Sequence, residues 1–239
     1  MNWNKNQVIA HRGAFRKNNF PENSIASLKE AIRLKCYGSE FDVHLTKDKI
    51  IVVNHDDDFL GMPIALTAYS ELMQKTLHNG EHLPTLENYL QEGIKQDHTK
   101  MILEIKIAPS LQETLELTDA VLNLVKKLNA GEWIEYISFS YEALLRVLQI
   151  DPEAKTAFLA EVNDEKSLEK LKSDRITQAD YDYTIYQTGN WFNQARQQEI
   201  TLNAWTVDQE SDMKKLLANH IDFITTNEPE LLFDLLRNS

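Results

Sequence analysis

The sequence of 239 residues contains a single cysteine, so no disulfide can form within the chain. Cys36 falls on the apolar face of an expected helix, where we expect a buried, inert thiol and no nucleophile. Glycine and proline are also sparse, with 7 and 6 residues, and no flexible linker, low-complexity segment or internal repeat divides the chain. These absences favour one domain over residues 1–239, which is long enough to bury a large core.

Long hydrophobic runs are missing as well. No apolar stretch approaches the ~20 residues of a membrane-spanning helix, which excludes stable membrane insertion. The first six residues hold no apolar segment typical of a signal peptide, and a polar motif begins at His11. We therefore expect no signal peptide and a cytoplasmic protein, with a signal sequence that has already been removed as the alternative.

Positive charge is in deficit, because 25 basic residues face 37 acidic ones and the net charge is −12. A general nucleic-acid surface needs clustered lysine and arginine, so binding to nucleic acid is not expected, and docking on anionic lipid is disfavoured. An anionic substrate would have to be attracted locally, by a bound cation with Arg12 and a lysine. No surface feature identifies an interface, which leaves the oligomeric state open.

Apolar strand-like runs alternate with amphipathic helix-like runs along the whole chain. The expected strands are 8–10, 38–43, 101–106, 133–139, 155–160, 183–186, 201–207 and 222–225. The expected helices are 24–35, 85–96, 110–128, 141–149, 164–171, 190–198, 209–219 and 228–237. Eight such units in about 240 residues predict a (β/α)8 TIM barrel, an α/β fold, with a doubly wound open sheet as the alternative. An additional strand is expected at 50–54, and 172–182 shows no clear pattern.

Polar residues stand at the carboxyl ends of several expected strands, which is where the active sites of such barrels lie. These residues are His11 and Arg12 after the first strand, Glu40 and Asp42 on the second, Glu104 and Lys106 on the third, and Trp205 on the seventh. Side chains two positions apart on a strand share a face. We therefore expect Glu40 with Asp42, and Glu104 with Lys106, to point into one barrel mouth.

Three carboxylates in one mouth would repel one another strongly without a cation. An all-oxygen set formed by Glu40, Asp42 and Glu104 predicts one divalent metal ion, Mg²⁺ or Ca²⁺. His11 and His55 can move protons near neutral pH, and Asp56 is placed to accept a ring proton of His55. Taken singly, each of these residues could equally be an ordinary surface group or loop histidine.

A series of short motifs resembles the glycerophosphodiester phosphodiesterase family in order and spacing. The motifs are Ala10-His11-Arg12-Gly13, Pro21-Glu22-Asn23-Ser24, Glu40-Phe41-Asp42-Val43, Leu45-Thr46-Lys47-Asp48, Val52-Val53-Asn54-His55-Asp56, Leu103-Glu104-Ile105-Lys106, Ser138-Phe139 and Ala204-Trp205-Thr206-Val207. Thr225-Thr226-Asn227 with Pro229 also looks like the last strand and turn of the family. The resemblance spans nearly the whole chain.

The resemblance implies a TIM-barrel phosphoric diester hydrolase that cleaves small glycerophosphodiesters to sn-glycerol 3-phosphate and an alcohol. It implies that His11 and His55 form the acid/base pair and that Arg12 and Lys106 contact phosphate. It further implies that Glu40, Asp42 and Glu104 hold the metal, that Glu22 and Asn23 support the site, and that Trp205 forms an apolar wall for the glycerol. Which histidine is the acid stays open, as does the nucleophile, the glycerol 2-hydroxyl or water.

Three features depart from the family pattern. The loop of residues 14–20 is longer than expected, 59–62 replace a usual substrate-contacting sequence, and His44 occupies a variable position, for which we expect a place at the rim.

A lysophospholipase D-type enzyme is an alternative, with an apolar rim from Phe15, Phe20, Phe59, Leu60 and Met62. The three carboxylates argue against a metal-independent phospholipase C. A catalytically inactive barrel that acts as a binding module is the second alternative, and the presence of both histidines and all three carboxylates argues against it.

Overall fold

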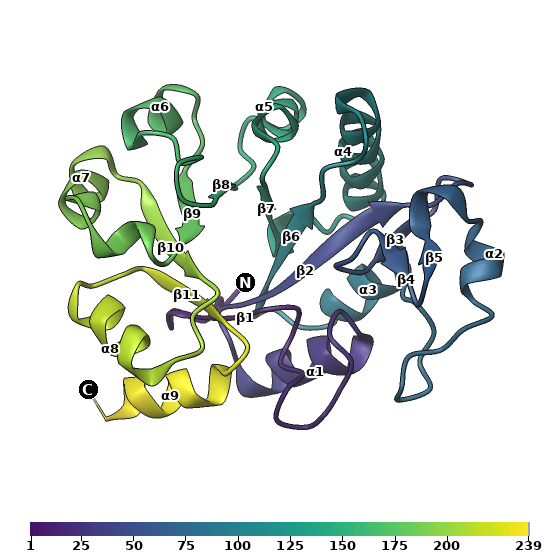
Figure 1. Ribbon diagram of the computed structural model, residues 1–239, viewed down its shortest axis with the longest axis horizontal. Helices are drawn as coiled ribbons and strands as arrows, with labels where there is room; N and C mark the ends of the chain where they lie inside the picture. The colour runs from purple at the N-terminus through teal and green to yellow at the C-terminus, as the bar shows by residue number, and fades with distance from the viewer. Residues whose placement is uncertain (239) are drawn as a thin grey trace.

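The computed structural model describes residues 1–238 and shows a closed barrel of parallel strands with helices around its outside (Figure 1). The barrel strands are β1 (Val8–Ala10), β2 (Gly38–Leu45), β6 (Lys100–Ile105), β7 (Ile134–Ser138), β8 (Thr156–Ala160), β9 (Gln178–Asp182), β10 (Thr201–Trp205) and β11 (Phe223–Thr226). They follow one another in chain order, and β1 pairs with both β2 and β11 to close the ring. The predicted (β/α)8 TIM barrel is confirmed.

The connecting helices pack on the barrel with the faces that their sequences predict. They are α1 (Ile25–Leu34), α3 (Leu86–Gly93), α4 (Leu111–Lys127), α5 (Tyr141–Ile150), α6 (Leu168–Ser173), α7 (Trp191–Gln198), α8 (Glu210–Ala218) and α9 (Pro229–Arg237). At the start of α4, the Ser110 hydroxyl accepts a hydrogen bond from the Glu113 backbone N–H, and Leu117 and Val121 are buried one turn apart. No helix within residues 1–238 combines the length and the apolar character that crossing a bilayer requires.

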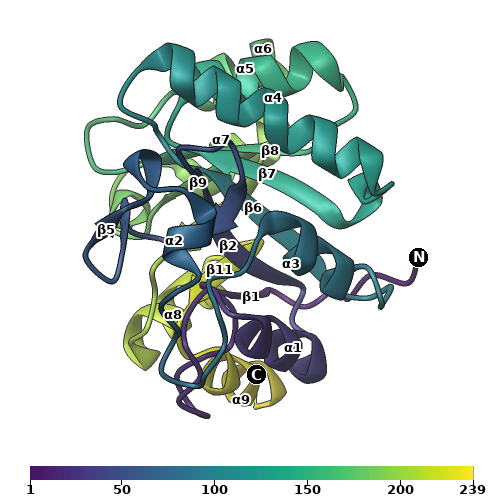
Figure 2. The same cartoon turned by 90° about the vertical axis from the view of Figure 1, so that its right-hand side faces the viewer.

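An insertion of residues 46–85 between β2 and α3 carries the predicted additional strand, β3 (Ile51–Val53), which pairs antiparallel with the end of β2. It continues through β4 (Asp58–Phe59), β5 (Met62–Pro63) and the short helix α2 (Tyr69–Leu72), and it lies beside the barrel (Figure 2). Val52, Phe59 and Ile64 belong to a small apolar core of its own. This insertion places His55, which follows β3 closely, at the barrel mouth.

The sixth barrel strand differs from the sequence prediction. The sequence pattern places it at residues 183–186, but the strand is β9, and residues 185–187 form a short 3-10 helix, η3 (Ile185–Gln187). The physical reason lies in the alternation of β9: Ala179 and Tyr181 belong to the apolar layer under the helices, whereas Gln178 and Asp180 are buried polar residues on the other face. The Tyr186 hydroxyl instead lies between the carbonyl oxygens of Ala179 and Asn203, at 3.1 and 2.9 Å, and its one hydrogen is shared between them.

One layer of the barrel interior below the mouth is apolar. Ile9, Ile102, Ile137 and Leu159 are buried in one cluster that is separate from the layer between strands and helices. Ile9 precedes His11, and Ile102 precedes Glu104, by two positions, so the polar residues share the inward direction of these apolar ones. The polar mouth therefore rests on a packed apolar layer.

Candidate active site

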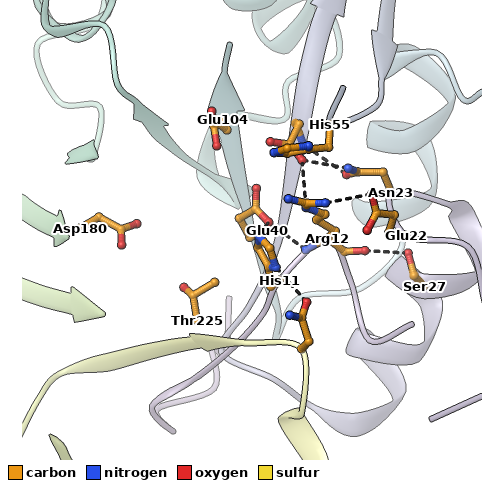
Figure 3. A network of polar contacts seen from close by, with 12 residues as sticks. His11, Arg12, Glu22, Asn23, Ser27, Glu40, His55, Glu104, Asp180 and Thr225 are labelled. Atoms are coloured by element: carbon orange, nitrogen blue, oxygen red, sulfur yellow. Dashed lines mark hydrogen bonds and ion pairs between the residues drawn. The ribbon is translucent and has the colours of Figure 1, made fainter. Parts of the chain in front are cut away.

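A cavity of ≈ 210 Å³ opens at the carboxyl ends of the strands. Seven residues singled out from the sequence line it: His11, Arg12, Glu40, His55, Glu104, Lys106 and Trp205. They come from the ends of β1, β2, β6 and β10 and from the insertion after β2, and Figure 3 shows His11, Arg12, Glu40, His55 and Glu104 among them. The structure therefore gathers around one cavity residues that lie up to almost 200 positions apart in the chain.

Three carboxylates form the most concentrated charge of the site. One oxygen each of Glu40, Asp42 and Glu104 lies within 4.8 Å of the others, and all three side chains are buried. The arrangement follows from strand register, since Asp42 is paired with Glu104 across β2 and β6, and Glu40 shares the face of Asp42. A compact, oxygen-only donor set of this kind fits one Mg²⁺ or Ca²⁺ ion.

Crowding of these carboxylates changes their protonation. Burial, together with repulsion from Asp42 and Glu104, raises the pKa of Glu40 well above its ordinary value. Burial and Asp42 likewise raise the pKa of Glu104, to about 8, although Lys106 opposes the shift. Burial also acts to raise the pKa of Asp42, but Lys106, His55, the hydrogen bond from Asn23 and Arg12 together outweigh it and the net shift is downward. A bound cation would offset the repulsion that raises the first two.

Arg12 is fixed beside the carboxylates by its unusual backbone. Its φ angle is 52°, its backbone N–H donates to Glu40 Oε2 at 2.8 Å, and its Nη1 donates to Glu22 Oε1 at 2.9 Å (Figure 3). Its Nε lies 3.9 Å from Asp42 Oδ2. Next to it Gly13 has a φ angle of 80°, and a Cβ there would lie 2.5 Å from Ser27 Oγ, so this turn requires glycine.

Asn23 connects this turn to the carboxylates. Its Nδ2 donates to Asp42 Oδ2 at 2.8 Å, and its Oδ1 accepts from the backbone N–H of Asp42 at 3.2 Å. The carbonyl oxygen of Arg12 accepts from the backbone N–H of Asn23 and from the hydroxyl of Ser27. Residues 21–24 thus tie the loop after β1 to the end of β2 and hold both in register.

Lys106 places a positively charged ammonium group within the carboxylate cluster. Its Nζ lies 3.0 Å from Glu104 Oε1 and 3.4 Å from Asp42 Oδ1. Burial acts to lower the pKa of Lys106, but Glu104 and Asp42 outweigh it and raise the pKa. Lys106 and Arg12 thus place two positive charges beside the same cavity, where they can contact an anionic substrate.

His11 is held from behind by a chain of hydrogen bonds. Its Nδ1 donates to Asn227 Oδ1 at 2.8 Å, and Asn227 Nδ2 in turn donates to Asp208 Oδ2 at 2.8 Å. The other ring nitrogen, Nε2, faces the carboxylates, 4.0 Å from Glu40 Oε2. Burial and the neighbouring Arg12 lower the pKa of His11 to about 4, so the ring is neutral near pH 7.

His55 enters the cavity from the insertion. Its Nδ1 lies 2.7 Å from Asp56 Oδ1, the contact expected from the sequence. Its carbonyl oxygen accepts a hydrogen bond from Nε2 of the buried His44 at 3.0 Å. His44 thus stands behind His55 and supports its backbone, and it is not among the residues that line the cavity.

Trp205 forms one wall of the cavity. Its Nε1 donates to the backbone carbonyl of Asp180 at 2.9 Å, and its ring meets Phe139 edge to face at 5.5 Å. The indole is therefore fixed in place and presents an apolar surface to the cavity.

Several residues of the site carry no assignment from the sequence. Asp180 lies in the segment that shows no clear pattern, and Asp208 and Asn227 follow strands at positions where hydrophobic periodicity gives no signal. Asp208 and Asn227 could have been identified from the sequence by their positions just after the ends of strands. Arg16, from the longer loop, pairs with Asp208 at 3.3 Å and with Glu228 at 2.7 Å, so this loop reaches the support of His11.

The apolar rim expected for an acyl chain is only partly formed. Phe59 is buried in the core of the insertion, whereas Leu60 is exposed. Phe59 nonetheless lines, with Phe15, Phe20 and Leu60, a second cavity of ≈ 570 Å³ beside Glu22 and Asp56.

Residues 11–231 match the Glycerophosphoryl diester phosphodiesterase family. A glycerophosphodiester phosphodiesterase from Caldanaerobacter subterraneus is 30% identical, with 98% of each chain covered. A crystal structure of a glycerophosphodiester phosphodiesterase from Parabacteroides distasonis superimposes with a TM-score of 0.93 at 35% identity, covering 99% of this chain and 98% of that one. A phosphodiesterase from Oleispira antarctica, solved in complex with the product sn-glycerol-3-phosphate, has the same fold, with a TM-score of 0.81, 22% identity and 97% of each chain covered.

Proposed function

The chain belongs to the glycerophosphoryl diester phosphodiesterase family and is a phosphoric diester hydrolase, and from this premise we propose its substrate and mechanism. We propose that it cleaves glycerophosphodiesters to sn-glycerol 3-phosphate and an alcohol, with one divalent cation and a pair of histidines. The glycerol phosphate bound in the Oleispira structure supports this choice of product.

The proposal rests on one observation: three carboxylates and two basic side chains lie next to one another at the same cavity. Glu40, Asp42 and Glu104 offer oxygens within 4.8 Å of one another, and Arg12 and Lys106 stand beside them. A cation held by the three carboxylates would neutralise charge on the phosphoryl oxygens. The residues present fit either Mg²⁺ or Ca²⁺.

Arg12 and Lys106 bind and orient the phosphodiester. Arg12 presents a planar guanidinium that can contact two phosphoryl oxygens, and Glu22 holds its Nη1 in place. Lys106 adds a second charge from the opposite side of Asp42. Together they keep the phosphorus in front of both histidines, which is the positioning that phosphoryl transfer needs.

His11 is the general base in this mechanism. Asn227 Nδ2 is committed to Asp208, whose carboxylate can only accept, so Asn227 presents its oxygen to His11. The proton of the neutral ring therefore stays on Nδ1, and the lone pair on Nε2 points into the cavity to remove the proton of the nucleophile, which is either the glycerol 2-hydroxyl or a water molecule.

His55 is then the general acid, and it donates a proton to the oxygen of the departing alcohol. Asp56 accepts a hydrogen bond from Nδ1, fixes the ring and stabilises its imidazolium form, whose second proton, on Nε2, is the one donated to the leaving oxygen. Proton transfer of this kind contributes typically ~10²–10⁴ in rate. Loss of either ring should therefore abolish turnover and leave cation binding nearly intact.

The experiment is a coupled assay for glycerol 3-phosphate after incubation of the chelator-stripped protein with glycerophosphocholine or glycerophosphoethanolamine, with Mg²⁺, Ca²⁺ or Mn²⁺ restored singly. We expect product only with a cation, and no product from His11→Ala or His55→Ala. Lysophosphatidylcholine, assayed in parallel, would be the better substrate if the enzyme were of the lysophospholipase D type. Absence of turnover with every cation and substrate would contradict the proposal and favour a binding module.

A further inference from the structure

A second group of polar side chains lines the barrel opposite the carboxylate cluster, and the mechanism above does not use it. Asp180, Asn203 and Thr225 come from the adjacent strands β9, β10 and β11, with Asn203 in register with Asp180. All three are buried, with at most 4% of each residue exposed. Asp180 and Thr225 line the cavity, and their side chains extend toward the space in front of Glu40 (Figure 3).

The hydrogen bonds within this group leave part of it unpaired. Asn203 Nδ2 donates to Asp180 Oδ1 at 2.7 Å and to Thr225 Oγ1 at 2.8 Å, so the same nitrogen holds the two oxygens side by side. Asn203 Oδ1 is buried and finds no hydrogen-bond partner among residues 1–238. Over the same residues, the hydroxyl hydrogen of Thr225 meets no acceptor and Asp180 Oδ2 meets no donor. Asp180 and Thr225, which line the cavity, therefore leave one acceptor and one donor open to a ligand there.

The chemistry of the group decides which ligand it fits. No lysine, arginine or histidine nitrogen from residues 1–238 forms an ion pair with Asp180, and burial raises the pKa of its carboxyl to about 7. A carboxyl here disfavours a phosphate, whose positive partners Arg12 and Lys106 belong to the carboxylate side of the cavity. An acceptor beside a hydroxyl donor matches an alcohol, which both donates and accepts, whereas a quaternary ammonium has no hydrogen to donate.

We propose that Asp180 and Thr225, positioned by Asn203, bind the free hydroxyl groups of the glycerol moiety and determine the preference of the enzyme for glycerol diesters. The inference rests on the proposed function and adds the substrate contacts that select the polyol. Trp205 supports the arrangement because its indole is fixed on the Asp180 backbone and faces the same cavity. A glycerol placed there has its carbon chain against an aromatic wall and its hydroxyls on the polar group.

The test compares two ligands that share a phosphate and a three-carbon chain, sn-glycerol 3-phosphate and n-propyl phosphate, by calorimetric titration of the cation-loaded protein. We expect the wild-type protein to bind glycerol 3-phosphate roughly tenfold to a hundredfold more tightly, the gain from hydrogen bonds to the two hydroxyls. Asp180→Ala and the isosteric Thr225→Val should each reduce this ratio toward one. The affinity for n-propyl phosphate should stay within about twofold of the wild-type value.

Glu161→Gln is the matched control, because it removes an exposed carboxylate that lines the same cavity. It should preserve the ratio, which separates hydroxyl recognition from net charge. If Asp180→Ala weakens both ligands equally, the group is only structural and the inference is overturned. Thr225→Val gives the same comparison with little change of shape, should Asp180→Ala fold poorly.

Two further outcomes would overturn the inference. One is a wild-type protein that binds both ligands equally, whatever its turnover. The other is an Asp180→Ala variant that loses affinity for phosphocholine and keeps its affinity for glycerol 3-phosphate, which would assign the group to an ammonium. Failure of the proposed function is a separate result, since it appears as absence of glycerol 3-phosphate release from glycerophosphodiesters by the wild-type protein.

Discussion

The side-chain oxygen of Asn227 lies 2.8 Å from Nδ1 of His11, although 216 positions separate the two residues. Asp208 determines this orientation, because it accepts hydrogen bonds from both the Nδ2 and the backbone N–H of Asn227. The carboxylate therefore acts on His11 through an amide, and the imidazole keeps one tautomer without a negative charge in direct contact.

Asp208→Asn removes this constraint, because an amide at position 208 can accept or donate and Asn227 can then turn its NH₂ toward His11. We expect kcat to fall about tenfold to a hundredfold, the usual effect of losing a partner that orients a functional histidine, with little change in KM. Steady-state kinetics on glycerophosphocholine measures both. Glu228→Gln is the control, since Glu228 contacts Arg16 but not Asn227; an equal loss in both variants would show that the loop, and not the tautomer, is responsible.

Glu104→Gln tests the cation site. Removing one of three carboxylate ligands should weaken Mg²⁺ or Ca²⁺ binding at least about tenfold and reduce the rise in Tm that the cation gives the wild-type protein. Isothermal titration of chelator-stripped protein measures the affinity. Glu135→Gln is the matched control. Glu135 is also a buried glutamate, on the next strand, but it accepts a hydrogen bond from the Tyr37 hydroxyl and lies outside the carboxylate cluster. Equal cation affinity in both variants would contradict the assignment of Glu104.

Most of the barrel could be predicted from the sequence because its strands and helices carry strong apolar periodicity. The strand that the sequence misplaces is the one whose inward positions are polar, Gln178 and Asp180, so the strand lacks an apolar run while the aromatic 183–186 imitates one. The carboxylates and both histidines are recognisable because they occur in short motifs at strand ends.

The supporting residues of the site were harder to predict. Asp208 and Asn227 act on His11 only because β1, β10 and β11 are neighbours in the closed ring, a relation that local sequence does not encode. The same holds for Asp180 and Thr225, which are brought together by the amide of Asn203 on the strand between them. Chemistry concentrated in one segment is visible in a sequence, whereas chemistry assembled across strands becomes visible only in the fold.

Asp180→Asn should change the pH dependence of stability. Burial raises the pKa of Asp180 to about 7 from an ordinary value near 3.8, so the folded protein favours the protonated form. The contribution of Asp180 to the free energy of unfolding is therefore fully present below the unfolded pKa. It is lost as pH rises toward 7, by up to a few kcal/mol at about 1.4 kcal/mol per pKa unit. An asparagine does not ionise, so the Tm of the variant should rise relative to that of the wild-type protein between pH 4 and 8. Glu161→Gln controls for net charge, and a constant difference across this range would contradict the prediction.

Gly13→Ala should both destabilise the protein and impair the site, because two separate effects meet at this residue. The φ angle of 80° disfavours any side chain, and the new Cβ would lie 2.5 Å from Ser27 Oγ and 2.7 Å from the Ser27 backbone carbon. Gly61→Ala is the matched control, since Gly61 has a φ angle of 84° but a Cβ added there would have no atom within 4 Å. We expect Gly61→Ala to cost about 1 kcal/mol through φ alone, and Gly13→Ala to cost about 1–3 kcal/mol more because α1 must shift. Since the neighbouring Arg12 N–H holds Glu40, kcat/KM should fall only in Gly13→Ala. Urea denaturation and kinetics on both variants measure the difference, and equal losses in the two would show that the contact with Ser27 does not position the site.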